Sequence, residues 1–161
     1  MNTDKKRFKI TPAVYLVLVK DGKILLLRRC NTGHHDGEYS FVAGHLNGRE
    51  TVRQAMAREA KEEADIKIKT DNLEIIHVMN RNSKNNSVDI RERIDFFIKA
   101  ESWQGEPKNM EIDKCDDLSW FDLDNLPENI IPYIKQTIDC IRKGVLYSEW
   151  GWPEIRTKNK E

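Results

Sequence analysis

The sequence predicts a single α+β domain in which helices pack against a mixed β-sheet. Strand-like runs occur both before and after one alanine-rich helical segment at residues 52–64, and a second helical segment follows near residue 130. A chain of 161 residues is long enough to bury a proper core without a second domain. We therefore expect one domain over residues 1–161, ordered from about residue 9 to about residue 153.

The first two strands are expected to form an antiparallel hairpin. Two aliphatic runs, at residues 13–19 and 23–29, flank Lys20-Asp21-Gly22, which is the strongest hairpin signal in the sequence. The preceding residues, 1–9, are polar and basic and are expected to fray.

A surface loop and a short buried strand should follow. Residues 30–38 have turn composition, and the adjacent His34 and His35 are expected to be solvated, because no third metal ligand lies at a suitable spacing. Residues 39–43 then form a strand that delivers the chain to Gly44.

The central helix is expected to begin near Val52 and to continue to Ala64. Thr51 and Gln54 have the spacing of a capping box, in which the threonine hydroxyl and the glutamine side chain each satisfy a free backbone N–H. No glycine or proline interrupts the segment, so local propensity favours about three helical turns.

Alternating strands and an acidic connection are predicted after this helix. Residues 73–79 and 90–101 are expected to be strands, whereas the asparagine-rich residues 80–87 are expected to form a mobile loop. Residues 110–117 form the acidic connection that precedes the segment Leu118–Leu123.

A last helix should start at Glu128 or Asn129 and end at Lys143 before Gly144. Its isoleucines recur at helical spacing and predict a face that packs on the core: Ile130, Ile134, Ile138 and Ile141.

The tail at residues 145–153 carries Tyr147, Trp150 and Trp152, which we expect to pack on the domain, the alternative being stacking on a nucleobase. Residues 156–161 are expected to be disordered.

The central helix carries three carboxylates that call for an explanation. Glu59, Glu62 and Glu63 follow i, i+3, i+4 spacing and converge on one side, partly turned toward the protein. A solvated mixed-charge helix is the simple interpretation. Against it, two carboxylates about 5 Å apart repel by about 3 kcal/mol at an effective dielectric of about 20, and a divalent cation would reverse that sign. Oxygen-only ligands suit Mg²⁺ or Mn²⁺ better than Zn²⁺.

These residues resemble the Nudix box, G-x5-E-x7-R-E-U-x-E-E-x-G-U, where U is a bulky aliphatic residue. The positions in register are Gly44, Glu50, Arg58, Glu59, Glu62, Glu63 and Ile66. Two positions depart from the pattern: Ala60 replaces a larger aliphatic residue, and Asp65 replaces the glycine that normally ends the helix. Aspartate can adopt the left-handed conformation that a helix end requires, at some cost relative to glycine.

The resemblance covers about residues 11–143 and implies the α/β/α sandwich of Nudix proteins. It implies that Glu62 and Glu63 are metal ligands, that Glu59 is a ligand or general base, and that the Gly44 carbonyl also binds the metal. Arg58 is implied to orient Glu50 rather than to touch substrate.

Candidate residues outside the box complete the predicted site. In such families an acidic connection often precedes a W-F-x-L-x-x-L-P segment, which Trp120–Pro127 matches. The additional carboxylate is therefore Glu111 or Asp113, with a solvated acidic loop as an equal alternative. Arg28 and Arg29, at the end of a predicted strand, are candidate phosphate contacts.

The predicted function is Mg²⁺-dependent hydrolysis of a nucleoside diphosphate linked to another group. A MutT-type conversion of a nucleoside triphosphate to a monophosphate and pyrophosphate is the first choice. A nucleotide-sugar or dinucleoside-polyphosphate hydrolase is the alternative, although the proline or tyrosine that some of those subfamilies place about sixteen residues beyond the box is absent. A non-catalytic nucleotide-sensing module is a further alternative, but such modules usually lose box carboxylates that this chain keeps.

The composition excludes several other classes of function. Lys+Arg and Asp+Glu both total 27, so no global field would attract nucleic acid or a membrane surface. Three widely spaced cysteines without a CxxC pair argue against a disulfide framework or a zinc site. No apolar run is long enough to span a bilayer. We therefore expect a cytoplasmic monomer or homodimer that binds a small nucleotide substrate.

Overall fold

Two β-sheets and two α-helices make up the described part of the protein, residues 8–84 and 90–152 of a computed structural model. The elements in chain order are β1 (Thr11–Val17), β2 (Val19–Lys20), β3 (Lys23–Arg29), β4 (Tyr39–Ser40), β5 (Val42–His45), α1 (Val52–Ala64), a 3₁₀ turn (Thr70–Asn72), β6 (Leu73–Lys84), β7 (Ile90–Ala100), β8 (Cys115–Asp122), α2 (Pro132–Arg142) and β9 (Tyr147–Trp150).

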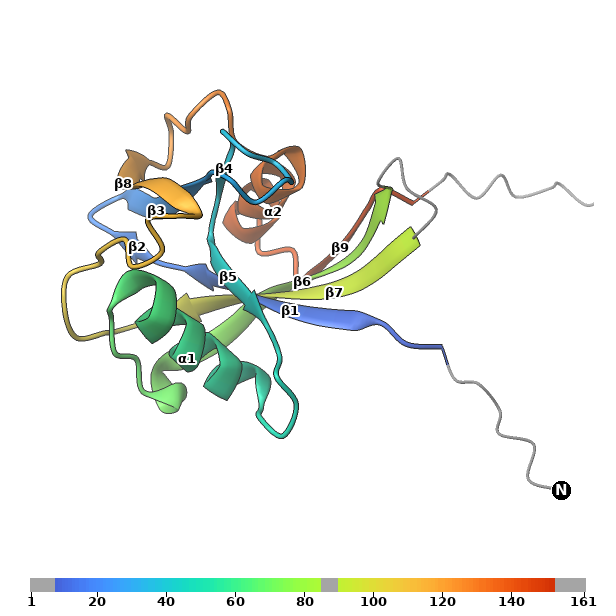
Figure 1. Cartoon of the computed structure of the whole chain (residues 1–161), viewed down its shortest axis with the longest axis horizontal. Coiled ribbons are helices and arrows are strands. Elements are labelled where there is room, and N and C mark those ends of the chain that lie inside the picture. Colours follow the sequence, from blue (N-terminus) through green and yellow to red (C-terminus); the bar gives the residue numbers. More distant parts are fainter. Residues whose placement is uncertain (1–7, 85–89, 153–161) are drawn as a thin grey trace, which may run out of the picture.

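The larger sheet has the strand order β5-β1-β7-β6-β9 and is mixed. β1 runs parallel to β7, and β6 runs parallel to β9, whereas the β1–β5 and β6–β7 pairs are antiparallel. Helix α1 lies on one face of this sheet and α2 on the other (Figure 1), and each helix covers its own hydrophobic core. The predicted α+β class and the layered α/β/α arrangement are thus confirmed.

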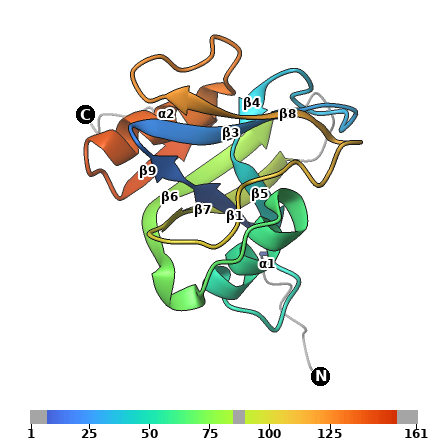
Figure 2. The same ribbon diagram turned by 90° about the vertical axis from the view of Figure 1, so that its left-hand side faces the viewer.

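The smaller sheet is built around β3, which lies beside β8 over its whole length (Figure 2). The predicted turn forms, since Asp21 and Gly22 have φ angles of 52° and 75°. The predicted hairpin between residues 13–19 and 23–29 forms only next to this turn, where Val19 and Lys20 pair antiparallel with β3. The rest of the prediction is wrong, because β1 joins the larger sheet. Side chains of β1 are buried alternately in the two cores, which requires a central position in a sheet covered on both faces.

The long strands β6 and β7 correct the predicted loop at residues 80–87. The strand at 90–101 is confirmed, but β6 continues from the predicted 73–79 through Lys84, paired with β7. From Val78 to Arg81 it also pairs with β9 on its other side. Asparagine has a low strand propensity, and here pairing partners override that preference. Residues 85–87 lie outside the described part.

Helix α1 begins and ends where the sequence predicts. The Thr51 hydroxyl accepts a hydrogen bond from the Gln54 N–H at 3.2 Å, and the Thr51 N–H donates to the Gln54 side chain at 2.8 Å. Asp65 ends the helix with a φ of 54° in the left-handed region, and its side chain contacts Lys61 one turn earlier.

Replacing Asp65 with glycine is expected to raise the melting temperature by about 1 to 3 °C, because glycine adopts a positive φ without strain. Loss of the exposed contact with Lys61 offsets only part of this gain. Asp65→Ala is the control and should lower the melting temperature, because alanine has neither the conformational freedom nor the ion pair. A lower melting temperature for the glycine variant than for the alanine variant would contradict this account.

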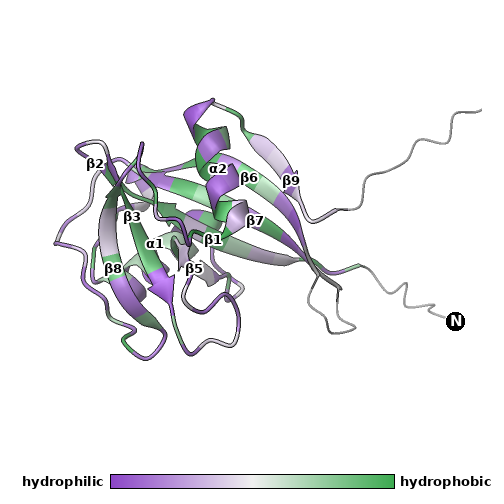
Figure 3. Ribbon diagram, turned by 90° about the horizontal axis from the view of Figure 1, so that it is seen from above, coloured by the Kyte–Doolittle hydropathy of each residue, from purple (hydrophilic) through white to green (hydrophobic). Residues whose placement is uncertain are grey.

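Helix α2 starts later than predicted, at Pro132 rather than at residue 128 or 129. The Tyr39 N–H donates to the Asn129 carbonyl, and the Ile131 N–H donates to the Tyr39 carbonyl. Residues 128 and 129 therefore form a turn, and residues 130 and 131 are extended beside Tyr39. The residue before a proline disfavours the helical region, and proline suits a first helical turn. Apolar and polar bands alternate along α2 (Figure 3), as the isoleucine spacing predicts.

Trp150 of the tail packs on the domain, as expected, whereas Tyr147 and Trp152 are exposed. β9 extends the larger sheet, and the Trp150 ring lies 6.5 Å from the Tyr133 ring of α2. The predicted disorder at residues 156–161 and most of the fraying at residues 1–9 concern positions outside the described part. Within the described residues, neither helix has the length and apolarity needed to cross a membrane.

Candidate active site

Arg58 of α1 joins the helix to the loop that leads into it. Its Nη2 donates to Glu50 at 2.8 Å and to the His45 carbonyl at 3.1 Å, and its Nε donates to the other Glu50 oxygen at 3.2 Å. Its Nη1 donates to Glu59 at 2.7 Å and to Glu62 at 3.1 Å. These bonds lower the pKa of Glu50. Arg58 therefore holds three box carboxylates and the entry loop in place.

Glu59 lies against the backbone of Gly44, at the edge strand β5. A Cβ atom placed on Gly44 would come within 2.0 Å of the Glu59 carboxyl carbon, so only glycine leaves room for this side chain. Glu59 is 9 % exposed, and desolvation raises the pKa of its carboxyl group despite the Arg58 contact. Residue 44 is glycine because a larger side chain would occupy the space that the Glu59 carboxyl group fills.

Glu63 and Glu111 meet on the same side of β5. The Ala43 N–H donates to Glu63 at 3.1 Å. Met110 donates its N–H to the Glu63 carbonyl at 3.0 Å, and Lys108 donates to the Ala64 carbonyl at 2.9 Å. These bonds satisfy carbonyls that the end of α1 leaves free, and they bring the neighbouring Glu111 to the site.

Burial makes this carboxylate pair costly. Desolvation raises the pKa of Glu63 to about 8, with the Ala43 N–H opposing the shift and repulsion from Glu111 and Glu59 adding to it. Lys114 contacts Glu111 at 2.8 Å, and this raises the pKa of the lysine. The ionised carboxylates therefore repel one another, and a bound cation would offset this repulsion.

The donors fit a hard divalent cation. Carboxylate oxygens and the Gly44 carbonyl at β5 are of the type that Mg²⁺ and Mn²⁺ prefer. Within residues 8–84 and 90–152, no three His, Cys, Asp or Glu side chains already form a closed metal cage. In this arrangement Glu59 and Glu62 accept hydrogen bonds from Arg58 instead.

Two cavities adjoin β5 and share Arg29 and Ala43. The carboxylate cavity, of about 370 Å³, is lined by Glu63, Glu111 and Lys114 together with these residues. The arginine–histidine cavity, of about 250 Å³, is lined by Gly44 and by Arg29, His34, His35, His45, Arg93 and Tyr133, among others. The two cavities therefore lie next to each other at the edge strand.

The structure does not bring every predicted residue to this point. Arg28 pairs with Asp116 at 2.7 Å, and neither Arg28 nor Asp113 lines the two cavities. The Asp113 carbonyl instead accepts a hydrogen bond from Asn31 at 3.2 Å. The Glu62 side chain is 57 % exposed and lines neither cavity.

Sequence reasoning missed the arginine–histidine cavity. His34 and His35, expected to be solvated, form part of its wall, and Arg93 and Tyr133 reach it from β7 and α2. Only the register of β7 against β1 and β5 places Arg93 beside this wall, so no local pattern signals it.

The fold and the carboxylates of α1 define the class of protein as one with the Nudix fold. The chain belongs to the NUDIX domain family, whose family model matches residues 9–139.

Solved and curated relatives agree with this assignment. The MutT NUDIX hydrolase from Burkholderia pseudomallei superimposes with a TM-score of 0.72 at 23% sequence identity, over 82% of this chain and 98% of that one. The NAD-capped RNA hydrolase NudC of Vibrio atlanticus (strain LGP32) is 28% identical over 143 residues, which are 84% of this chain and 48% of the relative. NudC of Escherichia coli (strain K12 / DH10B) is 38% identical over 61 residues, 38% of this chain and 23% of the relative. The chain thus spans about half or less of these curated relatives.

Proposed function

We propose that this protein hydrolyses a nucleoside diphosphate linked to another group, with a nucleoside triphosphate as substrate and a monophosphate and pyrophosphate as products. The observation that carries this proposal is the meeting of Glu59, Glu63 and Glu111 around Gly44, at the point where the two cavities join. A diphosphate at this point leaves room for its substituent on the other side of β5.

Each box residue has a proposed role. Glu62 and Glu63 hold Mg²⁺, or Mn²⁺, with the Gly44 carbonyl, and Glu59 is a further ligand or the general base. Glu111 is the carboxylate from outside the box, since its position beside Glu63 favours it over Asp113. A metal held by these residues would neutralise phosphate oxygens and position water for in-line attack.

Arginines support this reaction in two different ways. Arg58 is a positioning residue, because its hydrogen bonds hold Glu50, Glu59 and the entry loop. Arg29 lines both cavities and is the proposed phosphate contact, whereas the ion pair of Arg28 with Asp116 directs it elsewhere.

The products test the proposal directly. Hydrolysis of a nucleoside triphosphate is expected to give a monophosphate and pyrophosphate, because metal at α1 stabilises charge on the inner phosphates. Attack at the middle phosphorus forms its bond to the water oxygen and breaks the bond to the bridging oxygen, which leaves with the monophosphate. Heavy-oxygen water should therefore label pyrophosphate, as measured by mass spectrometry.

Other products distinguish the alternatives. Label in the monophosphate would move attack to the inner phosphorus within the same enzyme class, whereas orthophosphate release would reject the pyrophosphohydrolase. A panel of nucleotide sugars, dinucleoside polyphosphates and NAD tests the linked-diphosphate alternatives, the last because two relatives are NAD-capped RNA hydrolases by name. Metal-dependent turnover of none of these compounds would favour a non-catalytic sensing module.

A further inference from the structure

The arginine–histidine cavity differs in charge from the carboxylate cavity. Its lining includes two arginines and three histidines but no aspartate or glutamate. It includes Gly44 and adjoins the carboxylate cavity at Ala43 and Arg29. A group attached to a diphosphate at Gly44 would enter the arginine–histidine cavity. The side chains of this cavity would then contact the part of the substrate that differs between nucleotides.

Arg93 is the cavity's most unusual residue, because it lies opposite another arginine. The register of β6 and β7 pairs Arg93 directly with Arg81, and like charges in this position destabilise a sheet. Arg81 is compensated: it forms a buried ion pair with Asp95, and its guanidinium lies 4.2 Å from the centre of the Tyr133 ring. The charge of Arg81 is therefore balanced by partners within the fold.

Arg93 has no such compensation in the part of the chain that the structure describes. It forms no ion pair there, and its Nη2 contacts Nε2 of His45. Its Nε is buried and has no hydrogen-bond partner among those residues. The His45 contact orients the guanidinium, whose Nη1 has no hydrogen-bond partner among the described residues.

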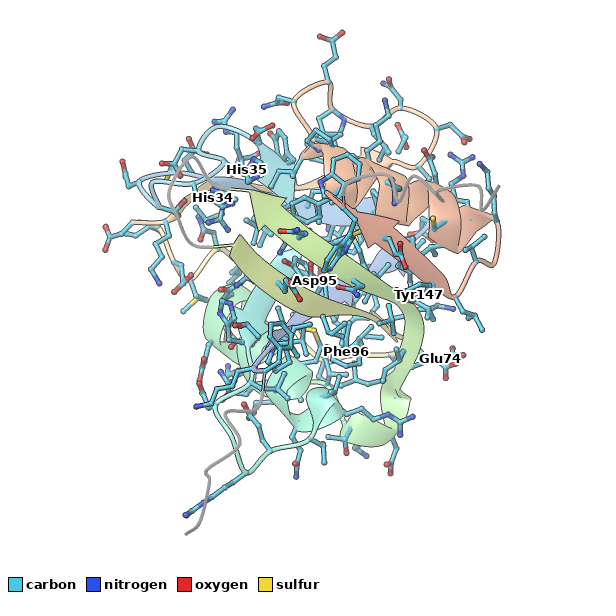
Figure 4. All side chains as sticks on the ribbon, turned by 90° about the vertical axis from the view of Figure 1, so that its right-hand side faces the viewer. His34, His35, Glu74, Asp95, Phe96 and Tyr147 are labelled. Atoms are coloured by element: carbon cyan, nitrogen blue, oxygen red, sulfur yellow. The ribbon has the colours of Figure 1, made fainter. Side chains whose placement is uncertain are left out.

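Several residues that line the arginine–histidine cavity carry planar rings. The His34 and His35 rings lie 4.2 Å apart, and the His35 ring lies 6.1 Å from that of Tyr133. Figure 4 shows the two histidines on their loop, next to the sheet that carries Asp95. Arg29 donates to the His34 carbonyl and to Thr32, which leaves it fewer donors for a ligand. One available guanidinium among planar rings suits the edge of a base better than a second phosphate.

We propose that Arg93 is a specificity-determining residue that binds the O6 and N7 acceptors of a 6-keto purine, so that guanine and hypoxanthine nucleotides are favoured over adenine nucleotides. Arginine pairs with both acceptors at once, whereas adenine presents an amino donor at the O6 position. The inference deepens the proposed function, on which it rests for the nature of the substrate.

Turnover and binding are measured separately to test it. Wild-type kcat/KM for GTP and ITP should exceed that for ATP by about 5- to 150-fold, the range that one bidentate contact provides. Binding of GMP, IMP and AMP by calorimetry should follow the same order without any hydrolysis. Arg93→Gln should abolish or reverse the order in both assays, because an amide pairs with N6 and N7 of adenine. Arg142→Gln, at the exposed end of α2, is the matched control and should keep it.

The outcomes separate this inference from the proposed function. Selective binding of GMP and IMP that Arg93→Gln removes supports the inference even where no triphosphate is hydrolysed, a result that would overturn the function alone. Equal binding of GMP and AMP by the wild type overturns the inference, whatever the turnover. Retention of the full preference by Arg93→Gln also overturns it, because the preference would then not depend on the guanidinium.

Discussion

Replacing Glu63 with glutamine is expected to lower turnover by about 100-fold or more, because glutamine keeps the shape of the side chain but removes a charged metal ligand. Steady-state pyrophosphate release at saturating Mg²⁺ measures the effect. Glu62→Gln should also lose activity by orders of magnitude, on the proposal that both carboxylates hold the metal. Glu74→Gln is the control, since Glu74 is an exposed carboxylate on β6, away from both cavities. Turnover within a few-fold of wild type for both box variants would reject the metal assignment.

The Glu63→Gln variant should not lose stability in metal-free buffer. Burial raises the pKa of Glu63 from its ordinary value to about 8, so the folded protein binds more protons than the unfolded chain between about pH 4.5 and pH 8. Stability from this group is therefore present at low pH and decreases as pH rises through that window. In EDTA, the melting temperature of the wild type should decrease more between pH 5 and about pH 8.5 than that of Glu63→Gln. Mg²⁺ should then raise the melting temperature of the wild type more than that of the variant.

Replacing Gly44 with alanine is expected to abolish most activity while changing the melting temperature little. The new methyl group would lie 2.0 Å from the Glu59 carboxyl carbon. The Glu59 side chain is flexible and can move aside, which limits the cost to folding but displaces a proposed ligand from β5. A displacement of about 1 Å at a reacting centre costs about 100-fold in rate. Pyrophosphate release and thermal unfolding, measured on the same sample, give the two readouts.

Gly151→Ala is the matched control for a glycine that has a structural role. Its added Cβ would lie 2.1 Å from the Asn82 carbonyl, which is backbone, and its φ is already 74°. This variant should lose stability and keep kcat at temperatures where it remains folded. Near wild-type turnover of Gly44→Ala would show that Glu59 does not need its place against β5.

Much of helix α1 is encoded locally, and the sequence predicts it correctly. The Thr51–Gln54 capping box, the interval to Ala64 and the left-handed Asp65 depend on contacts within a few residues, and all of them form. The convergence of Glu59 and Glu63 on one side follows from helical periodicity alone. Their chemical roles remain predictions until the variants above are measured.

Elements that depend on distant partners were predicted less well. The turn at Asp21–Gly22 forms, but residues 11–17 leave their sequence neighbour for β5 and β7, because a strand buried on both faces must be central. Asn80 and Asn82 lie within β6, since β7 pairs with this stretch on one side and β9 pairs with it as far as Arg81 on the other. Strand propensity is weaker than such pairing.

What the sequence by itself determined was the helix, its caps and a set of carboxylates at fixed spacing, since these depend on the 3.6-residue period and on neighbours in the chain. Tertiary structure alone placed Glu111, and not Asp113, beside Glu63, because backbone N–H groups of residues 108 and 110 bond to the last carbonyls of α1 and bring Glu111 there. It alone also placed Arg93 opposite Arg81, beside a histidine loop from another part of the chain. Strand register decides such contacts, and register is set by the burial of whole strands rather than by any residue within the site.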